Sequence, residues 1–309
     1  MQLYLPVAQL PVSLFVVLGI GLAVGFLSGM LGVSGGFVTT PLLIFYGIPS
    51  GIAVASQASP VAAAALVGAI RQGGKKSVDY KMGFWLLLGG LAGSALGVSI
   101  FRLLQKLGQI DFVIKISYLI LLGGIGTLML IESLRAMRAA RQGAYVDRRP
   151  GQHTWIHNLP FKMRFYRSGL YISVIPVAVL GFLVGIMTAI LGTGGAFILI
   201  PAKVYLLRMR TTLAIGTSQF QMFIVACMTT VLHASVDHTV DIVLAMLLVL
   251  GGVVGAQFGV GAGARLRAEQ LRIALALLIV AIAIRLFFGL VITPSHLYTI
   301  IDVSGGSGA

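Results

Sequence analysis

The feature that most constrains this chain is a series of apolar stretches long enough to cross a lipid bilayer. A helical span needs about 20 apolar residues to cross roughly 30 Å of hydrocarbon. Hydrophobic residues make up 58% of the 309 residues and charged residues only 10%, which is too little charge to cover a soluble domain. Eight stretches qualify as spans, and they cover approximately residues 11–31, 52–70, 83–101, 112–132, 171–191, 212–232, 242–262 and 272–291. We therefore expect an all-α polytopic membrane protein.

Two further apolar stretches, residues 37–47 and 197–207, are too short to cross the bilayer as helices. Each follows a glycine cluster and contains a proline, Pro41 in the first and Pro201 in the second. Such segments either re-enter the membrane from one side or cross it as a short helix continued by extended chain.

The basic residues favour crossing. Lys and Arg together number 22 against 8 acidic residues, for a net charge of +14. If both short segments cross and the N-terminus is outside, 17 of the 22 basic residues fall in cytoplasmic loops, whereas re-entrant segments would expose a basic cluster outside. The positive-inside rule then predicts ten segments, with both termini on the outer side. The charge reflects topology and contact with membrane lipid, so we expect no nucleic-acid partner.

The chain also carries an internal repeat. Residues 31–41 match residues 191–201 at an offset of 160, and residues 88–93 match residues 250–255 at an offset of 162. The Gly-Phe-Leu at position 25 recurs at position 181, which predicts one extra helical turn in the second copy. With five segments per copy, the copies are inverted, and inverted repeats place the substrate near the midplane between them. The predicted organisation is a first repeat (1–132), a basic cytoplasmic linker (133–170), a second repeat (171–302) and a tail (303–309).

The glycine clusters are candidates for anion binding. Each opens a short helix, whose unpaired N–H groups and positive end attract an anion. Two such ends facing each other could hold one small oxyanion between them. The alternative is that the glycines only bend the chain or allow close helix packing.

A polar cluster in each copy adds hydroxyl and amide groups that could coordinate oxyanion oxygens; the alternative is hydrogen bonding between helices. Lys203 lies in the second short segment, and charged residues inside a membrane are candidates for function. The expected substrate-binding residues are Gly32, Val33, Ser34, Gly35, Gly36, Ser56, Gln57, Ser59, Thr193, Gly194, Gly195, Lys203, Thr217, Ser218 and Gln219.

Enzyme and metal chemistry have little support in the sequence. Residues 32–36 fit the Gly-x-Ser-x-Gly pattern of a serine hydrolase, with His233 as the nearest base. However, the repeat partner of Ser34 is Gly194, and a nucleophile turn has no reason to be duplicated without its nucleophile. Cys227 is the single cysteine, so no disulfide or CxxC site exists. We expect no catalytic residues, metal or cofactor.

On these stretches the sequence resembles the sulfite exporter TauE/SafE family of the toluenesulfonate uptake permease superfamily. The matching parts are residues 25–41, 56–59 and 88–97 and their copies at 181–201, 214–219 and 250–259. The resemblance implies a bacterial inner-membrane permease, with periplasmic termini, for a small sulfur-containing anion such as sulfite, thiosulfate or sulfoacetate. Residues 56–60 depart from the Gly-Thr-Ser pattern of the family, which the second copy keeps at residues 216–218, so the two half-sites differ.

We therefore expect a secondary transporter that works by alternating access, with an anion channel as the alternative. Export of an anion from an inside-negative cell is favourable by about 2.3 kcal/mol per charge per 100 mV. Import would need coupling, for which protons are the expected partner. The residues do not indicate the direction of transport or an oligomeric state.

The predicted topology can be tested with single cysteines in a variant that lacks Cys227. Cysteines within residues 233–241 and within residues 265–272 should react with an impermeant thiol reagent from opposite sides of the membrane. Labelling of both regions from the same side would rule out the inverted repeat.

Overall fold

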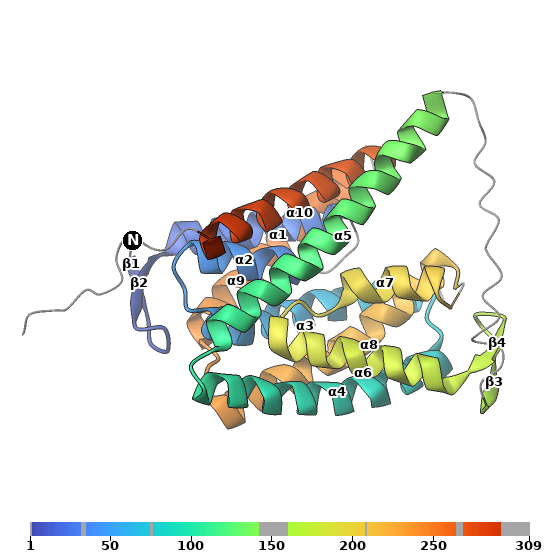
Figure 1. The fold of residues 1–309 in the computed structure, drawn as a ribbon, viewed down its shortest axis with the longest axis horizontal. Coiled ribbons are helices and arrows are strands. Elements are labelled where there is room, and N and C mark those ends of the chain that lie inside the picture. Colours follow the sequence, from blue (N-terminus) through green and yellow to red (C-terminus); the bar gives the residue numbers. More distant parts are fainter. Residues whose placement is uncertain are drawn as a thin grey trace, which may run out of the picture.

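The computed structural model of the protein describes residues 2–31, 35–74, 77–141, 160–207, 209–263 and 268–291. It is a bundle of apolar α-helices with two small β-hairpins (Figure 1). The helices of the first half are α1 (Leu14–Leu31), α2 (Gly36–Phe45), α3 (Ser50–Gly74), α4 (Tyr80–Lys106) and α5 (Ile110–Arg141). Those of the second half are α6 (Val174–Leu191), α7 (Ala196–Tyr205), α8 (Thr211–Leu232), α9 (Ile242–Gly263) and α10 (Ala268–Val291), with a π-helical turn, His233–Asp237, after α8.

The predicted apolar stretches are confirmed as helices, the eight long ones as well as the two short ones. Within the described residues, six helices are long and apolar enough to cross a membrane: Ser50–Gly74, Tyr80–Lys106, Ile110–Leu128, Val174–Leu191, Thr212–Asp237 and Ile242–Gly259. Shorter apolar helices cover Leu14–Met30, Gly36–Phe45 and Ala276–Val291.

The prediction of an all-α fold was incomplete, because a β-hairpin precedes the first long helix of each half. Strand β1 (Gln2–Leu5) pairs with β2 (Leu10–Ser13), and β3 (Lys162–Phe165) pairs with β4 (Leu170–Ser173). Both pairs are antiparallel and enclose four-residue turns. Four-residue strands are too short to stand out beside a 20-residue apolar run, so hydropathy alone does not reveal them.

The two hairpins match each other at a constant offset of 160 residues, and so do the helices that follow. Helices α1 and α6 both have 18 residues, and α2 and α7 both have 10. The predicted extra turn in the second copy was therefore wrong. The residue equivalent to Gly25 is Gly185, and the residue equivalent to Gly181 is Gly21. The second copy also begins at its hairpin, within the predicted linker of residues 133–170.

Glycines bring the helices of the two halves into backbone contact. Helix α1 packs along α9, and α6 packs along α4. A Cβ atom on Gly25 would overlap the main chain of Gly252, and one on Gly185 would overlap the main chain of Gly90. Small residues at helix interfaces allow this close approach in membranes. Each half therefore packs its first long helix against the fourth helix of the other half.

Helices α3 and α8 contact each other between these two pairs, and α5 packs against α10. In Figure 1 the hairpins lie at opposite ends of the bundle, β1–β2 beside the N-terminus and β3–β4 at the far end. Both hairpins are anchored by apolar side chains. Leu5 is buried in a cluster that includes Leu244 and Leu248 of α9, and its counterpart Phe165 is buried in one that includes Met82 and Leu86 of α4.

The backbone contact between α1 and α9 predicts how Gly25→Ala and a matched control should behave. Gly25→Ala should lower the melting temperature in detergent, by an amount equivalent to about 1–3 kcal/mol of overpacking. Gly19→Ala, on the same helix, meets no atom within 4 Å and should leave the melting temperature unchanged or raise it slightly. Equal melting of both variants and the wild type would show that this contact does not hold the helices together.

Candidate functional site

A cavity of about 350 Å³ lies beside the first glycine cluster. Gly35 and Gly36, at the start of α2, line it together with Gln57 of α3 and Gln219 of α8. Further polar groups come from Ser28, Thr39, Gln72 and Gln257, and the remaining wall is apolar. Its described lining includes no charged residue. The cavity therefore offers hydroxyls, amides and a helix N-terminus to a ligand of modest size.

The two glycine clusters meet at this point. A Cβ atom on Gly36 would lie 2.9 Å from the carbonyl oxygen of Thr193 and 3.1 Å from that of Gly192. Gly192, Gly194 and Gly195 have φ angles of 65°, 69° and 62°, a region that residues with a Cβ atom rarely enter. The second cluster thus needs its glycines for backbone conformation, and the hydroxyl of Thr193 accepts a hydrogen bond from the Gly195 amide at 3.3 Å.

Two of the predicted polar residues hold helices together. The hydroxyl of Ser56 accepts a hydrogen bond from the Asp241 main-chain N–H at 2.9 Å, and the hydroxyl of Thr217 accepts one from the Asp79 N–H at 3.0 Å. Both side chains are completely buried. These matching contacts favour the interhelical alternative for Ser56 and Thr217 and show that the two residues are equivalent.

The aspartates in these contacts were missed by the sequence analysis. The Asp241 carboxylate accepts hydrogen bonds from the N–H groups of Val243 and Leu244, in the first turn of α9, and of Val7, in the turn of the first hairpin. The Asp79 carboxylate likewise accepts from Met82 in α4 and from Ser168 in the turn of the second hairpin. Each hairpin is thus fastened to a helix start. The signal was a Val-Asp pair repeated at the same 162-residue offset as the glycine motif.

Lys203 does not line the cavity. Its side chain is fully buried, and its Nζ donates a hydrogen bond to the Ser218 hydroxyl at 2.9 Å. The equivalent residue in the first half is Leu43, which is also buried. The structure therefore places Lys203 and Ser218 in a polar contact of the second half, away from the open space.

Gln57 and Gln219 remain the best-placed ligand groups. Both line the cavity, both are nearly buried, and the Oε1 atom of each lacks a hydrogen-bond partner. Buried amides normally have their polar atoms paired. Gly68 provides the space for one of them, because a Cβ atom there would lie 2.8 Å from the Gln219 Cδ.

The remaining predicted residues either do not line the cavity or lie outside the described part of the chain. Ser59 is half-buried and does not line the cavity, and Gly194 and Gly195 pack against side chains of neighbouring helices. Gly32, Val33 and Ser34 lie outside the described residues.

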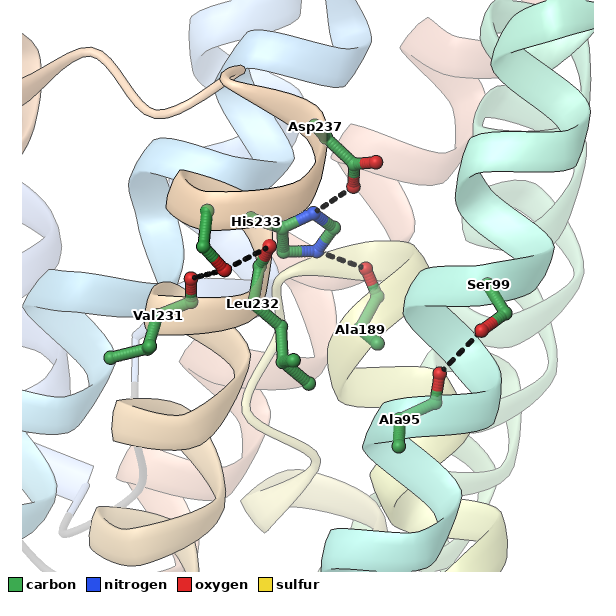
Figure 2. Close-up of polar contacts among 8 residues, drawn as sticks. Ala95, Ser99, Ala189, Val231, Leu232, His233 and Asp237 are labelled. Carbon is green, nitrogen blue, oxygen red and sulfur yellow. Dashed lines mark hydrogen bonds and ion pairs between the residues drawn. The ribbon is translucent and has the colours of Figure 1, made fainter.

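The histidine that a serine hydrolase would need is occupied. Figure 2 shows the His233 ring between two acceptors: Nδ1 lies 3.0 Å from Asp237 Oδ2 and Nε2 lies 3.1 Å from the Ala189 carbonyl oxygen. With both ring nitrogens bonded, His233 has no nitrogen free to activate a nucleophile.

Comparison with known proteins agrees with these features. The model of the family described as "Sulfite exporter TauE/SafE" matches residues 17–286. The chain belongs to this family. It is 30% identical over 277 residues to a "probable membrane transporter protein" of Xylella fastidiosa strain 9a5c, covering 89% of this chain and 94% of that one. It is 28% identical over 240 residues to the "probable membrane transporter protein YjnA" of Bacillus subtilis, covering 77% and 86%. No solved structure matches.

Membership of the TauE/SafE family, together with the six long apolar helices, makes the chain a multi-pass membrane transporter. The family match spans both copies of the glycine cluster and both aspartates. The duplicated core therefore forms the part that this chain shares with its relatives.

The hairpin anchors predict that Asp241→Asn should destabilise the protein. An amide has one oxygen in place of two, so at least one of the three N–H groups would lose its acceptor. The cost should be about 1–3 kcal/mol, seen as a lower melting temperature in detergent.

The matched control for this variant is Asp111→Asn, at the exposed start of α5, which should change the melting temperature little. If both substitutions have the same small effect, the Asp241 anchor is not important for stability.

Proposed function

We propose that the protein is a secondary transporter of a small sulfur-containing anion, such as sulfite, thiosulfate or a short organosulfonate. The observation that carries this proposal is the cavity beside the first glycine cluster, which the amide side chains of Gln57 and Gln219 line from opposite halves. The anion would lie against the N-terminus of α2, whose positive end favours negative charge. The amides of Gln57 and Gln219 would donate hydrogen bonds to its oxygens.

The apolar wall supports an anion that carries carbon or a second sulfur atom. Valine and alanine side chains of α3 and two valines of α9 also line the cavity. A sulfonate head could contact the amides while its remaining part contacts these apolar groups. The described lining has no carboxylate to repel it.

We further propose that the two halves are inverted repeats of five membrane segments each. Several observations support this arrangement: the offset of 160 to 162 residues between matching segments of the halves, the matched helix contacts of α1 with α9 and of α6 with α4, and the hairpins at opposite ends (Figure 1). The short helices α2 and α7 would then meet near the middle of the bacterial inner membrane, with both termini periplasmic.

The cavity gives the proposal its mechanism, because only one of the two equivalent positions is open among the described residues. Ala64 of α3 lines the cavity, whereas its counterpart in α8, Val225, is buried and fills the space beside Gly90. The cavity also extends to Gln72 and Gln257, near the basic loops that are predicted to be cytoplasmic. We infer that this structure is the inward-facing state. The outward-facing state would form if the space beside Ala64 closed and the equivalent space beside Val225 opened.

A thermal-shift screen of the purified protein tests the ligand class. Thiosulfate, sulfite or sulfoacetate should raise the melting temperature, and the rise should grow with ligand concentration, whereas sulfate, chloride and taurine serve as comparison ligands. Stabilisation by a cation or a neutral amino acid, without any effect of a sulfur anion, would contradict the proposal.

Gly68→Ala tests the site itself, because the added methyl group displaces the Gln219 side chain. Loss of a hydrogen bond to a charged ligand costs about 1.5–3 kcal/mol, so affinity should fall roughly 10-fold to 100-fold. The matched control is Gly74→Ala on the same helix, where the added Cβ meets nothing within 4 Å. If both variants bind the anion with equal affinity, the anion does not bind beside Gln219.

A further inference from the structure

His233 and Asp237 form a buried pair that the proposed anion cavity does not use. They begin and end the π-helical turn that follows α8. Both side chains are completely enclosed, and Nδ1 of His233 lies 3.0 Å from Oδ2 of Asp237. π-Helical turns are rare, and they occur frequently at functional sites.

The hydrogen bonds of this pair determine how many protons it holds. The Ala189 carbonyl oxygen can only accept a hydrogen bond, so the His233 Nε2 that lies 3.1 Å from it must carry a proton. The contact between Nδ1 and the Asp237 carboxyl then needs a second proton, on either the nitrogen or the oxygen. Without that proton, a nitrogen lone pair would face a carboxylate oxygen. The geometry in Figure 2 is therefore that of the proton-loaded pair.

Loss of the second proton would leave the carboxylate in an unfavourable position. The other Asp237 oxygen, Oδ1, is buried and has no hydrogen-bond partner among the described residues. An unpaired buried charge is strongly unfavourable. Deprotonation should therefore break the contact and move the side chains, so the pair has two distinct arrangements.

The pair is connected to the second glycine cluster. Its Nε2 bond holds the carbonyl of Ala189, and the hydroxyl of Tyr118 donates to the carbonyl of Leu191. Both carbonyls belong to the last turn of α6, where helix geometry leaves them without intrahelical partners. The next residue is Gly192, which contacts Gly36 at the edge of the anion cavity. Movement of His233 thus acts on the backbone that leads into the proposed site.

Few other charges surround the pair in the described part of the chain. Helix α6 has no titratable residue, and helix α8, which ends before the π-helical turn, has no charged residue. Helix α4 contacts the His233 ring with Phe101, at 4.6 Å between centroids, whereas the adjacent Arg102 is exposed. Helix α5 contributes Tyr118, and His238 is exposed. Asp237 is thus the acidic group against the ring.

The pair is present in one half only. When α3 and α8 are aligned through Ser56 and Thr217, the residue equivalent to His233 is Gln72, which does not titrate. Structural contacts such as the aspartate anchors occur twice, but a coupling ion is needed once per transport cycle. The single copy fits the second role.

The geometry points to the His233–Asp237 pair as the proton-binding site that couples proton movement to anion transport. This inference rests on the proposed function. A bound anion favours the proton-loaded, uncharged pair over the negatively charged one, and such coupling is reciprocal. Proton and anion therefore bind together and cross in the same direction, as in a symporter.

The test uses the full-length protein in proteoliposomes with pyranine inside, and ³⁵S-labelled thiosulfate and sulfoacetate outside. Neither anion takes up a proton near neutral pH, so any proton that enters is carried by the protein. With the membrane potential clamped at zero, an acidic exterior should drive about tenfold accumulation of label per pH unit for one proton per anion, and pyranine should report acidification.

His233→Gln keeps a donor for the Ala189 carbonyl but removes the Nδ1 atom that shares the second proton with Asp237. It should retain exchange of label at equal pH on both sides and lose both the gradient-driven accumulation and the pyranine signal. Asp237→Asn should behave in the same way. The matched control is His238→Asn, which should respond to the gradient like the wild type.

The outcomes separate the two proposals. If the wild type exchanges label but His233→Gln still responds to the gradient, or if anion entry makes the interior alkaline, the proton site is wrong and the proposed function stands. If the wild type exchanges neither anion, the proposed function fails.

If neither anion is exchanged, the pH dependence of the melting temperature still tests the His233–Asp237 pair by itself. Rising pH should lower the melting temperature of the wild type more than that of His233→Gln, because only the wild type loses the bond to Asp237. Parallel curves would overturn the inference.

Discussion

Close contact between helix backbones at glycine is the constraint on which this structure depends. Gly25 and Gly252 bring α1 against α9, and Gly185 and Gly90 bring α6 against α4. Because each pair joins one helix from each half, neither half forms its full set of contacts alone. The glycine clusters before the two short helices meet within this frame.

The aspartate anchors add a second constraint, on the ends of the bundle. Asp241 ties the turn of the first hairpin to the start of α9, the helix that packs along α1. Asp79 ties the turn of the second hairpin to the start of α4, the helix that packs along α6. Their buried carboxylates are acceptable because main-chain N–H groups, and for Asp79 also a hydroxyl, surround them. The anchors repeat in both halves, and so define a common frame. Against this frame, two features that do not repeat are candidates for function: the open cavity and the His233–Asp237 pair.

The sequence predicted the helices well because long apolar runs and the repeated glycines are strong local signals. It did not predict the hairpins, because their strands are too short for a hydropathy pattern. The identical Gly-Phe-Leu triplets suggested that Gly25 is equivalent to Gly181, which the helix register of the structure contradicts. The site could be predicted only in part. Of the predicted substrate-binding residues, Gly35, Gly36, Gln57 and Gln219 line the cavity. For Ser56, Thr217 and Lys203, only the positions of partners distant in sequence show that the side chains are already engaged.

Accessibility of the two equivalent cavity positions tests the central claim most directly. In a variant without Cys227, Ala64→Cys lies on the open side and Val225→Cys on the closed side. If the halves alternate as inverted repeats, an impermeant thiol reagent should modify position 64 from the cytoplasmic side only and position 225 from the periplasmic side only. A bound sulfur anion should slow both reactions. Modification of both positions from the same side of the membrane would contradict the account.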